Sequence, residues 1–310
     1  MIVQNSEKEL IPLKKHIGSI FVLAAGTLWG SMGVFVRHFS AAGLGAMEIV
    51  WFRNLFGLLF LGAYMALFHR DLLKFRWKDL WCFVCLGFGS MFLSNVTYNT
   101  AIQHTSLAVA GVLLYTSPIF VMLFSALLFK ETVTKRKLTA LVIVFLGCIL
   151  VSGLGSDSQI STEGILWGLS SGITYASYSI FSRFAIKRGY GSWTITFWSF
   201  VFCFTACSFF CDWSLVRTVW TSPAELGWAA ALGIITSFLP YVLYGLGLAT
   251  MENSRASILA SVEPVVAALF SLFLFHEPMG LGNAIGMLLV LGAIVILSSN
   301  KKAAALSESL

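Results

Sequence analysis

One carboxylate lies inside an apolar stretch of the chain, directly before a proline. Glu263 precedes Pro264 in the apolar segment 255–275. A charged side chain at that depth in a bilayer costs at least about 2.5 kcal/mol, so it is expected to face a cavity or a partner. The proline removes one backbone hydrogen bond and frees carbonyl oxygens nearby. We interpret Glu263 as a candidate cation or proton site; the alternative is a neutral glutamic acid that bonds across helices.

A single basic residue, Arg53, is placed well within an apolar segment. Its guanidinium has the right chemistry to bind the carboxylate of a substrate. It has an alternative partner in Glu48, about one and a half helical turns away near the membrane surface. We favour the pairing with Glu48, as a structural interaction.

Two further glutamates end apolar segments at equivalent places. Glu131 follows the segment that contains Pro118, and Glu277 follows the segment that contains Pro264. We interpret the two glutamates and the two prolines as structural residues. The glutamates would act as helix caps or gate anchors at opposite faces of the membrane. Solvation of two ordinary helix ends is the alternative.

Other polar and aromatic side chains recur at mid-segment positions. Polar groups at this depth usually face the interior of a helix bundle, although some serve only as hydrogen bonds between helices. The predicted cavity-lining and substrate-binding residues are Trp29, Asn95, Tyr98, Asn99, Tyr115, Ser117, Tyr175, Tyr241, Tyr244 and Ser261.

The composition requires a membrane setting for these residues. Of 310 residues, 58% are hydrophobic and 11% are charged, and the mean hydropathy is +0.86. A soluble protein carries about 25% charged residues. Soluble enzymes, nucleic-acid binders and disordered proteins are therefore excluded, although the net charge is +6.

Ten apolar segments are long enough to approach the span of a bilayer, which takes about 20 helical residues. They are 17–37, 47–68, 79–100, 106–129, 138–155, 163–184, 193–211, 225–249, 255–275 and 281–298. Short loops join them. We expect tails at 1–16 and 299–310 and two five-helix units at 17–155 and 163–298.

The basic residues fix the expected orientation. With the amino terminus inside, 17 of the 20 lysines and arginines fall on the inner side and two on the outer side. Basic loops face the cytoplasm. We therefore expect a multi-pass protein of the cytoplasmic membrane with both termini cytoplasmic.

The chain repeats itself at a constant offset of 146 residues. Pro118 matches Pro264, Glu131 matches Glu277 and Tyr98 matches Tyr244. Each copy holds five segments, so the second copy enters the membrane from the opposite side. Inverted repeats are typical of secondary transporters, which bind substrate near the midplane between the repeats.

The run PIFVMLFSALLFKE (118–131) and its echo PVVAALFSLFLFHE (264–277) resemble the EamA family of the drug/metabolite transporter superfamily. The first-helix run GTLWGS and Arg53 fit the same family. The resemblance implies ten helices around a central cavity and transport of small metabolites, often by export of amino acids or related compounds.

Competing classes lack their signatures. A membrane enzyme would need a motif such as HExxH or GxSxG, and the sequence contains neither. A receptor has no need of an inverted repeat. The sequence also lacks the GxxxxGK[ST] motif that would indicate an ATPase. We expect no cofactor and no metal. Because Arg53 is the one basic side chain expected in the cavity, we favour small zwitterions as substrates. Export of organic cations is the alternative. The GxxxG of Gly282 and Gly286 leaves monomer and homodimer open.

Overall fold

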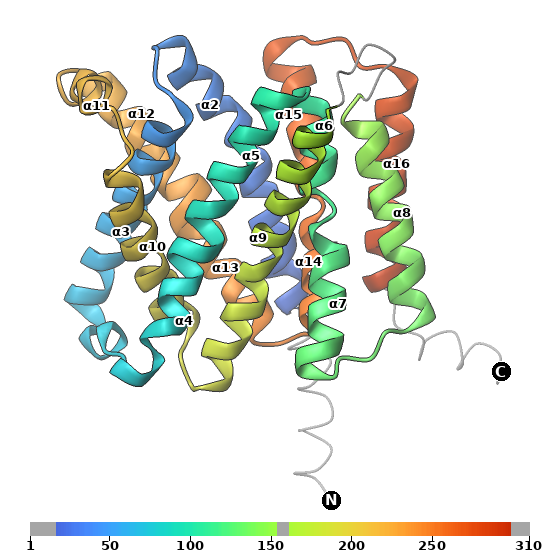
Figure 1. Ribbon diagram of the computed structural model, residues 1–310, viewed down its shortest axis with the longest axis horizontal. Coiled ribbons are helices and arrows are strands. Elements are labelled where there is room, and N and C mark those ends of the chain that lie inside the picture. The colour runs from blue at the N-terminus through green and yellow to red at the C-terminus, as the bar shows by residue number, and fades with distance from the viewer. Residues whose placement is uncertain (1–16, 154–160, 299–310) are drawn as a thin grey trace, which may run out of the picture.

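The computed structural model describes residues 17–153 and 161–298, and the two predicted tails lie outside the described residues. Within these ranges the regular structure is helical throughout, as Figure 1 shows. Long helices lie side by side as a bundle. The predicted all-α class is confirmed.

The first half contains five helical spans. The first span is Ile17–Ala41, which ends as α2 (Met32–Ala41), and the second is α3 (Ala46–Phe68). After the short turns η1 (Arg70–Leu73) and η2 (Trp77–Asp79), the third span joins α4 (Leu80–Val84), the π-helical η3 (Cys85–Phe92) and α5 (Leu93–His104). The fourth consists of α6 (Leu107–Leu114) and α7 (Ser117–Phe129), and the fifth is α8 (Lys135–Val151).

The second half repeats this plan. Its first two spans are α9 (Thr162–Lys187) and α10 (Ser192–Ser208), and α11 (Trp213–Trp220) bends away from α10 by 118°. The next span joins α12 (Pro223–Gly233), the π-helical η4 (Ile234–Phe238) and α13 (Leu239–Leu248). The last two are α14 (Asn253–Ala260) with α15 (Glu263–Phe275), and α16 (Leu281–Ser298).

Length and hydropathy alone identify seven described helices that could cross a membrane, or eight with the bent pair α10 and α11. The helices α8 and α10 have 17 residues each, slightly short of the usual span of about 20. The 26-residue α9 is long enough but rich in serine and threonine. With α8, α9 and α10, which run alongside the other spans in Figure 1, the helix order described above agrees with the predicted arrangement of ten spans.

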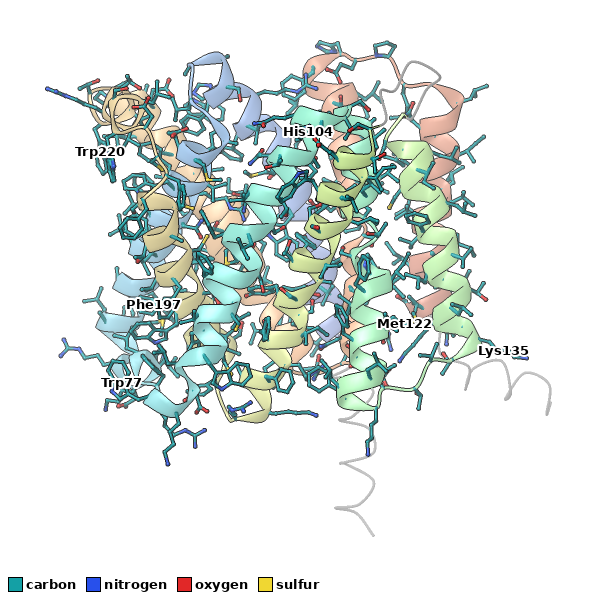
Figure 2. The ribbon with its side chains drawn as sticks, in the orientation of Figure 1. Trp77, His104, Met122, Lys135, Phe197 and Trp220 are labelled. Atoms are coloured by element: carbon teal, nitrogen blue, oxygen red, sulfur yellow. The ribbon has the colours of Figure 1, made fainter. Side chains whose placement is uncertain are left out.

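The second half is inverted relative to the first. In Figure 1, α7 runs to the lower end of the bundle, whereas its counterpart α15 runs to the upper end. Figure 2 places Trp77 and Lys135 at the lower end and His104 and Trp220 at the upper end. We call the lower end, where α7 and α9 end and α8 begins, the basic face, and the upper end the opposite face.

Each half presses a glycine against the other half. A Cβ on Gly87 would lie 2.5 Å from the Cβ of Phe202, and a Cβ on Gly233 would lie 2.4 Å from the Cβ of Phe56. Gly87 lies within the π-helical η3 and Gly233 directly precedes the π-helical η4, and the two contacts are related by the offset of 146 residues. These close approaches dock the third span of each half on the second span of the other.

A left-handed residue ends the fourth span of each half. Lys130 has a φ of 56° and its repeat counterpart His276 has a φ of 53°. The next amide then bonds back into the helix, from Glu131 to Ser125 and from Glu277 to Ser271. The backbone therefore presents Glu131 and Glu277 in the same way at the two ends of the bundle.

The GxxxG of the last span is partly used within the chain. A Cβ on Gly286 would lie 2.6 Å from the carbonyl oxygen of Gly147, so α16 packs tightly on α8. No atom lies within 4 Å of the corresponding point on Gly282 among the described residues. Gly286 thus serves packing inside the protomer.

Candidate functional site

A cavity of about 660 Å³ lies between the two repeats. This volume falls within the usual range for small-molecule sites. All ten predicted cavity residues line it, and they come from both halves: Trp29, Asn95, Tyr98, Asn99, Tyr115, Ser117, Tyr175, Tyr241, Tyr244 and Ser261. Glu263, Arg53 and Pro118 line it as well.

Two broken spans bring backbone ends to the centre of the bundle. The fourth span breaks before Ser117 and the ninth before Glu263, which are the first residues of α7 and α15. Pro118 and Pro264 follow, where a missing N–H costs nothing because the first amides of a helix have no intrahelical acceptor. The positive end of the α15 dipole therefore favours a carboxylate at Glu263.

Glycines bring the first span of each half against these breaks. A Cβ on Gly30 would lie 2.8 Å from the carbonyl oxygen of Glu263, and a Cβ on Gly172 would lie 2.9 Å from that of Leu113. Only glycine allows such an approach. The contacts hold Trp29 and Tyr175 at the cavity wall.

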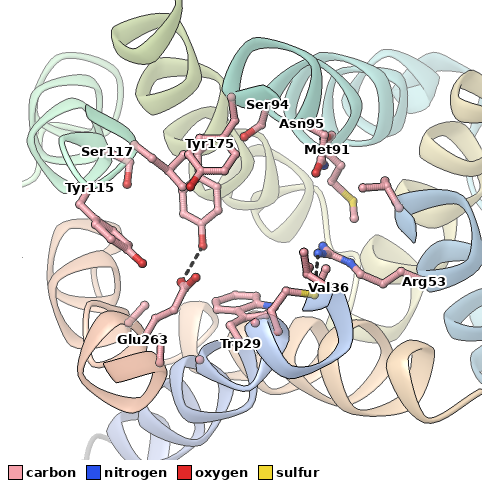
Figure 3. A pocket seen from close by; sticks show the side chains of 18 of the residues that line it. Trp29, Val36, Arg53, Met91, Ser94, Asn95, Tyr115, Ser117, Tyr175 and Glu263 are labelled. Atoms are coloured by element: carbon pink, nitrogen blue, oxygen red, sulfur yellow. Dashed lines mark hydrogen bonds between the residues drawn. The ribbon is translucent and has the colours of Figure 1, made fainter. Parts of the chain in front are cut away.

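The Glu263 carboxylate has a hydroxyl partner. The Tyr175 hydroxyl donates a hydrogen bond of 3.3 Å to Oε2 of Glu263, drawn as a dashed line in Figure 3. Among the described residues no basic side chain forms an ion pair with it. Its carboxyl group therefore lies at the cavity wall without a basic partner among the described residues.

Arg53 is held by neutral groups. Its Nε donates to the Ser237 hydroxyl at 3.0 Å and its Nη2 to the Tyr241 hydroxyl at 3.2 Å. The predicted pairing with Glu48 is wrong, because Oε1 of Glu48 accepts the amide of Asp212 at 2.8 Å. Five residues along a helix turn two side chains about 140° apart, so Arg53 and Glu48 point in different directions.

A carboxyl group and a guanidinium thus line one cavity. Figure 3 shows Glu263 and Arg53 on opposite sides, with Trp29 between them. Both side chains are half-buried at the cavity wall, where a counter-charge is attracted more strongly than in bulk water.

Aromatic rings form much of the remaining wall. The Trp29 ring lies 5.2 Å from that of Tyr241 and 5.3 Å from that of Tyr244, between ring centroids. The hydroxyls of Tyr244 and Ser179 are 2.8 Å apart. Such a wall binds apolar or cationic parts of a solute and leaves few hydroxyls free.

The sequence prediction missed many lining residues, among them Met91, Ser94, Tyr178 and Ser179. Tyr178 and Ser179 lie one helical turn after Tyr175, and Ser94 and Met91 lie one turn before Tyr98 and Asn95. Extending each predicted position by three or four residues would have found them, because such residues share a helix face.

The cavity opens at the opposite face. Its lining extends to Arg37, Ser40, Leu107 and Phe275, at the opposite-face ends of α2, α6 and α15. It stops near Tyr244 on the way to the basic face. Glu277, outside the lining, forms an ion pair of 2.6 Å with Arg37. Hydrogen bonds from Arg37 and Ser271 lower the pKa of the Glu277 carboxyl.

Glu131 binds the start of α14 at the basic end. Its Oε1 accepts the amide of Asn253 at 2.8 Å, and its Oε2 accepts the amide and the hydroxyl of Ser254 at 3.2 and 2.8 Å. The first amides of α14 are thereby satisfied. Arg183 adds a bond of 2.8 Å from its Nε to the Asn253 side-chain oxygen.

Comparisons with known proteins agree with the repeats and the cavity. Residues 16–153 and 162–299 each match the EamA-like transporter family. An Archaeoglobus fulgidus protein described as an uncharacterized transporter is 31% identical over 281 residues, which cover 90% of this chain and 95% of the relative. The pseudopaline exporter CntI of Pseudomonas aeruginosa is 28% identical over 293 residues, covering 92% and 97%.

One solved crystal structure has the same fold, with a TM-score of 0.76 and 19% identity over 90% of this chain and 95% of the other. The family match confirms the resemblance seen in the two fourth-span motifs. The molecule is a multi-pass membrane protein built to carry a small molecule, and the chain belongs to the EamA-like transporter family.

Proposed function

We propose that this protein is a secondary transporter that exports amino acids or related small zwitterionic and amphipathic compounds by alternating access. The basic face lies in the cytoplasm together with both termini, and the membrane is the cytoplasmic membrane. The protein works as a monomer or homodimer without an ATPase subunit, and it releases its solute chemically unchanged.

One observation carries this proposal: Arg53 and Glu263 line the same cavity without an ion-pair partner among the described residues. A zwitterion satisfies both, because its carboxylate binds the guanidinium and its ammonium binds the carboxylate. The aromatic wall accommodates an apolar substituent between the two charges. A nucleotide or phosphate ester would require more cations than this cavity offers.

Glu263 is also the proposed proton or cation site. Its repeat counterpart is Ser117, which does not titrate, so the coupling group belongs to one half only. The titratable groups that interact with Glu263 are Tyr98, Tyr115, Tyr175, Tyr241, Cys148 and Arg53. Export is supported by the Pseudomonas aeruginosa relative, whose name describes an exporter.

Counterflow in proteoliposomes tests the charge assignment. We expect the protein to exchange zwitterionic amino acids, and Arg53→Gln to lower that exchange about tenfold or more, because a charge-assisted hydrogen bond to the carboxylate is lost. The methyl ester of the same amino acid, which lacks the carboxylate, should be moved equally by wild type and Arg53→Gln. Equal loss for both solutes would contradict the role of Arg53.

The same vesicles test coupling. Uptake into vesicles driven by a pH gradient should disappear in Glu263→Gln, while exchange at equal pH on both sides persists at a reduced rate. A gradient response that survives in Glu263→Gln would contradict proton binding there and would leave uniport standing.

A second candidate is an exporter of organic cations such as quaternary amines. The observation that favours it is the group of rings beside Glu263, because Trp29 and Tyr175 supply faces for cation–π contact next to a carboxylate. Transport of a quaternary amine that does not change in Arg53→Gln, without any exchange of zwitterions, would select this reading.

A further inference from the structure

The closed and open ends of the bundle use equivalent residues differently. At the basic face, Glu131 binds the first residues of α14, and Asn253 and Ser254 are 0% and 1% exposed. Their repeat counterparts at the opposite face are Leu107 and Ala108, the first residues of α6. Leu107 is 65% exposed and lines the mouth of the cavity.

Glu277 occupies the place that would bind α6 if the opposite end were closed. It is the repeat counterpart of Glu131, and the left-handed residue before each presents both in the same way. In this structure Glu277 pairs with Arg37 instead, whose guanidinium also lies 4.2 Å from the centre of the Phe275 ring. Arg37, Phe275 and Leu107 all surround the mouth.

The start of α6 is chemically suited to receive the carboxylate. The first amides of a helix have no intrahelical acceptor, and the helix dipole favours a negative charge there. The Ser106 hydroxyl accepts the amide of Val109, which is the third residue of α6. The amides of Leu107 and Ala108 correspond to the two that Glu131 binds on α14.

We propose that Glu131 and Glu277 close the two ends in turn by exchanging partners. When the cavity opens to the basic face, Glu131 leaves the amides of Asn253 and Ser254, and Glu277 leaves Arg37 and accepts the amides of Leu107 and Ala108. This inference rests on the proposed alternating access, and it names the residues that hold each state.

The two closed ends are not equally stable, and the sequence indicates which of them forms more hydrogen bonds. Ser254 adds a hydroxyl donor to Glu131, whereas Ala108 has none to give Glu277. Asn253 also accepts a hydrogen bond from Arg183, whereas Leu107 has no side-chain acceptor. The basic end therefore closes with more hydrogen bonds, which favours the state that opens at the opposite face.

Moving one hydroxyl between the ends tests the exchange. Ser254→Ala removes the donor at the basic end, and Ala108→Ser supplies it at the opposite end. Each hydrogen bond to a charged group is worth about tenfold, so the double variant shifts the balance between states about a hundredfold. The second substitution adds a contact, so its effect is not a consequence of misfolding.

The reporter is a thiol introduced by Ile102→Cys in the full-length purified protein. Ile102 lines the mouth, and its repeat counterpart Leu248 is 0% exposed, so symmetry predicts burial of position 102 after the exchange. Labelling with a water-soluble maleimide should slow at least about threefold in Ser254→Ala/Ala108→Ser. The parent chain, whose native thiols are buried or half-buried, gives the background rate.

Glu277→Gln is the specificity control. Added to the double variant, it weakens the acceptor of the new hydroxyl and should restore most of the fast labelling, whereas Glu163→Gln, at an exposed glutamate elsewhere on the opposite face, should not. Labelling that does not respond to the hydroxyl exchange in protein that elutes as a single species, or that slows equally with Glu277→Gln present, overturns the inference. If the wild type moves no solute in the counterflow assays while the labelling pattern is as expected, the proposed transport function is overturned. The exchange of hydrogen-bond partners by Glu131 and Glu277 is then still supported.

Discussion

Glu131 and Glu277 occupy the same position of the repeat, yet their surroundings differ at the two ends of the bundle. Glu131 is half-buried and binds three donors of α14, whereas Glu277 is 46% exposed and binds Arg37 at the mouth of the cavity. The carboxylate alone therefore does not close an end. Closure depends on a helix start that is buried against it.

The largest expected difference is in thermal stability. Glu131→Gln weakens three hydrogen bonds to a carboxylate in a half-buried setting, so we expect a loss of about 2–4 kcal/mol in the free energy of unfolding. Glu277→Gln removes an exposed ion pair, which contributes little. Thermal unfolding of both variants in one detergent compares them, and equal shifts in Tm would contradict the assigned difference between the ends.

A smaller difference is expected for the two equivalent arginines. Arg183 donates to the Asn253 side chain and to the Met251 carbonyl, whereas its counterpart Arg37 contacts the exposed Glu277 and the half-buried Phe275 ring at the mouth. Arg183→Gln should therefore speed hydrogen exchange of the α14 amides about tenfold, through the loss of charge-assisted bonds. Arg37→Gln should leave α6 exchange unchanged. Faster hydrogen exchange in α6 of Arg37→Gln, without a change in α14 of Arg183→Gln, would contradict the assigned difference between the two arginines.

The smallest effect is a change with pH at the open end. The pKa of Glu277 is lowered by Arg37 and Ser271 from its ordinary value of 4.5. A lowered pKa means that the pairing stabilises the folded state above the ordinary value and is lost as the pH falls through the lowered one. A fluorophore on Ser40→Cys should report no change between about pH 7 and 5 and a change only in more acidic solution. The same signal in Glu277→Gln should stay flat.

Most of what could be predicted from the sequence, the order of the helices and the residues of the cavity, came from the internal repeat. The offset of 146 residues fixed the order of the helices and selected side chains at equivalent depths, which is why all ten predicted cavity residues share one cavity. Helical periodicity then limits which neighbours can join them. The residues missed, such as Tyr178 and Ser94, lie one turn from predicted positions.

Contacts between distant segments were beyond the sequence. Closeness along one helix suggested that Arg53 pairs with Glu48, but the partners of Arg53 lie on the eighth span, at Ser237 and Tyr241. The binding of Glu131 to α14 joins residues 122 and 123 positions apart. Such pairs depend on how the spans pack and on which end is closed. The spacing of residues along one helix predicts neither.

The left-handed residues Lys130 and His276 bear on the thermodynamics of transport. Both keep a positive φ although one lies at the closed end and the other at the open end. The steric cost of that conformation is therefore common to both states and cancels from the equilibrium between them. A glycine at either position would relieve the cost, worth up to about 1 kcal/mol, and would strengthen the fold without tilting the carrier toward either side of the membrane.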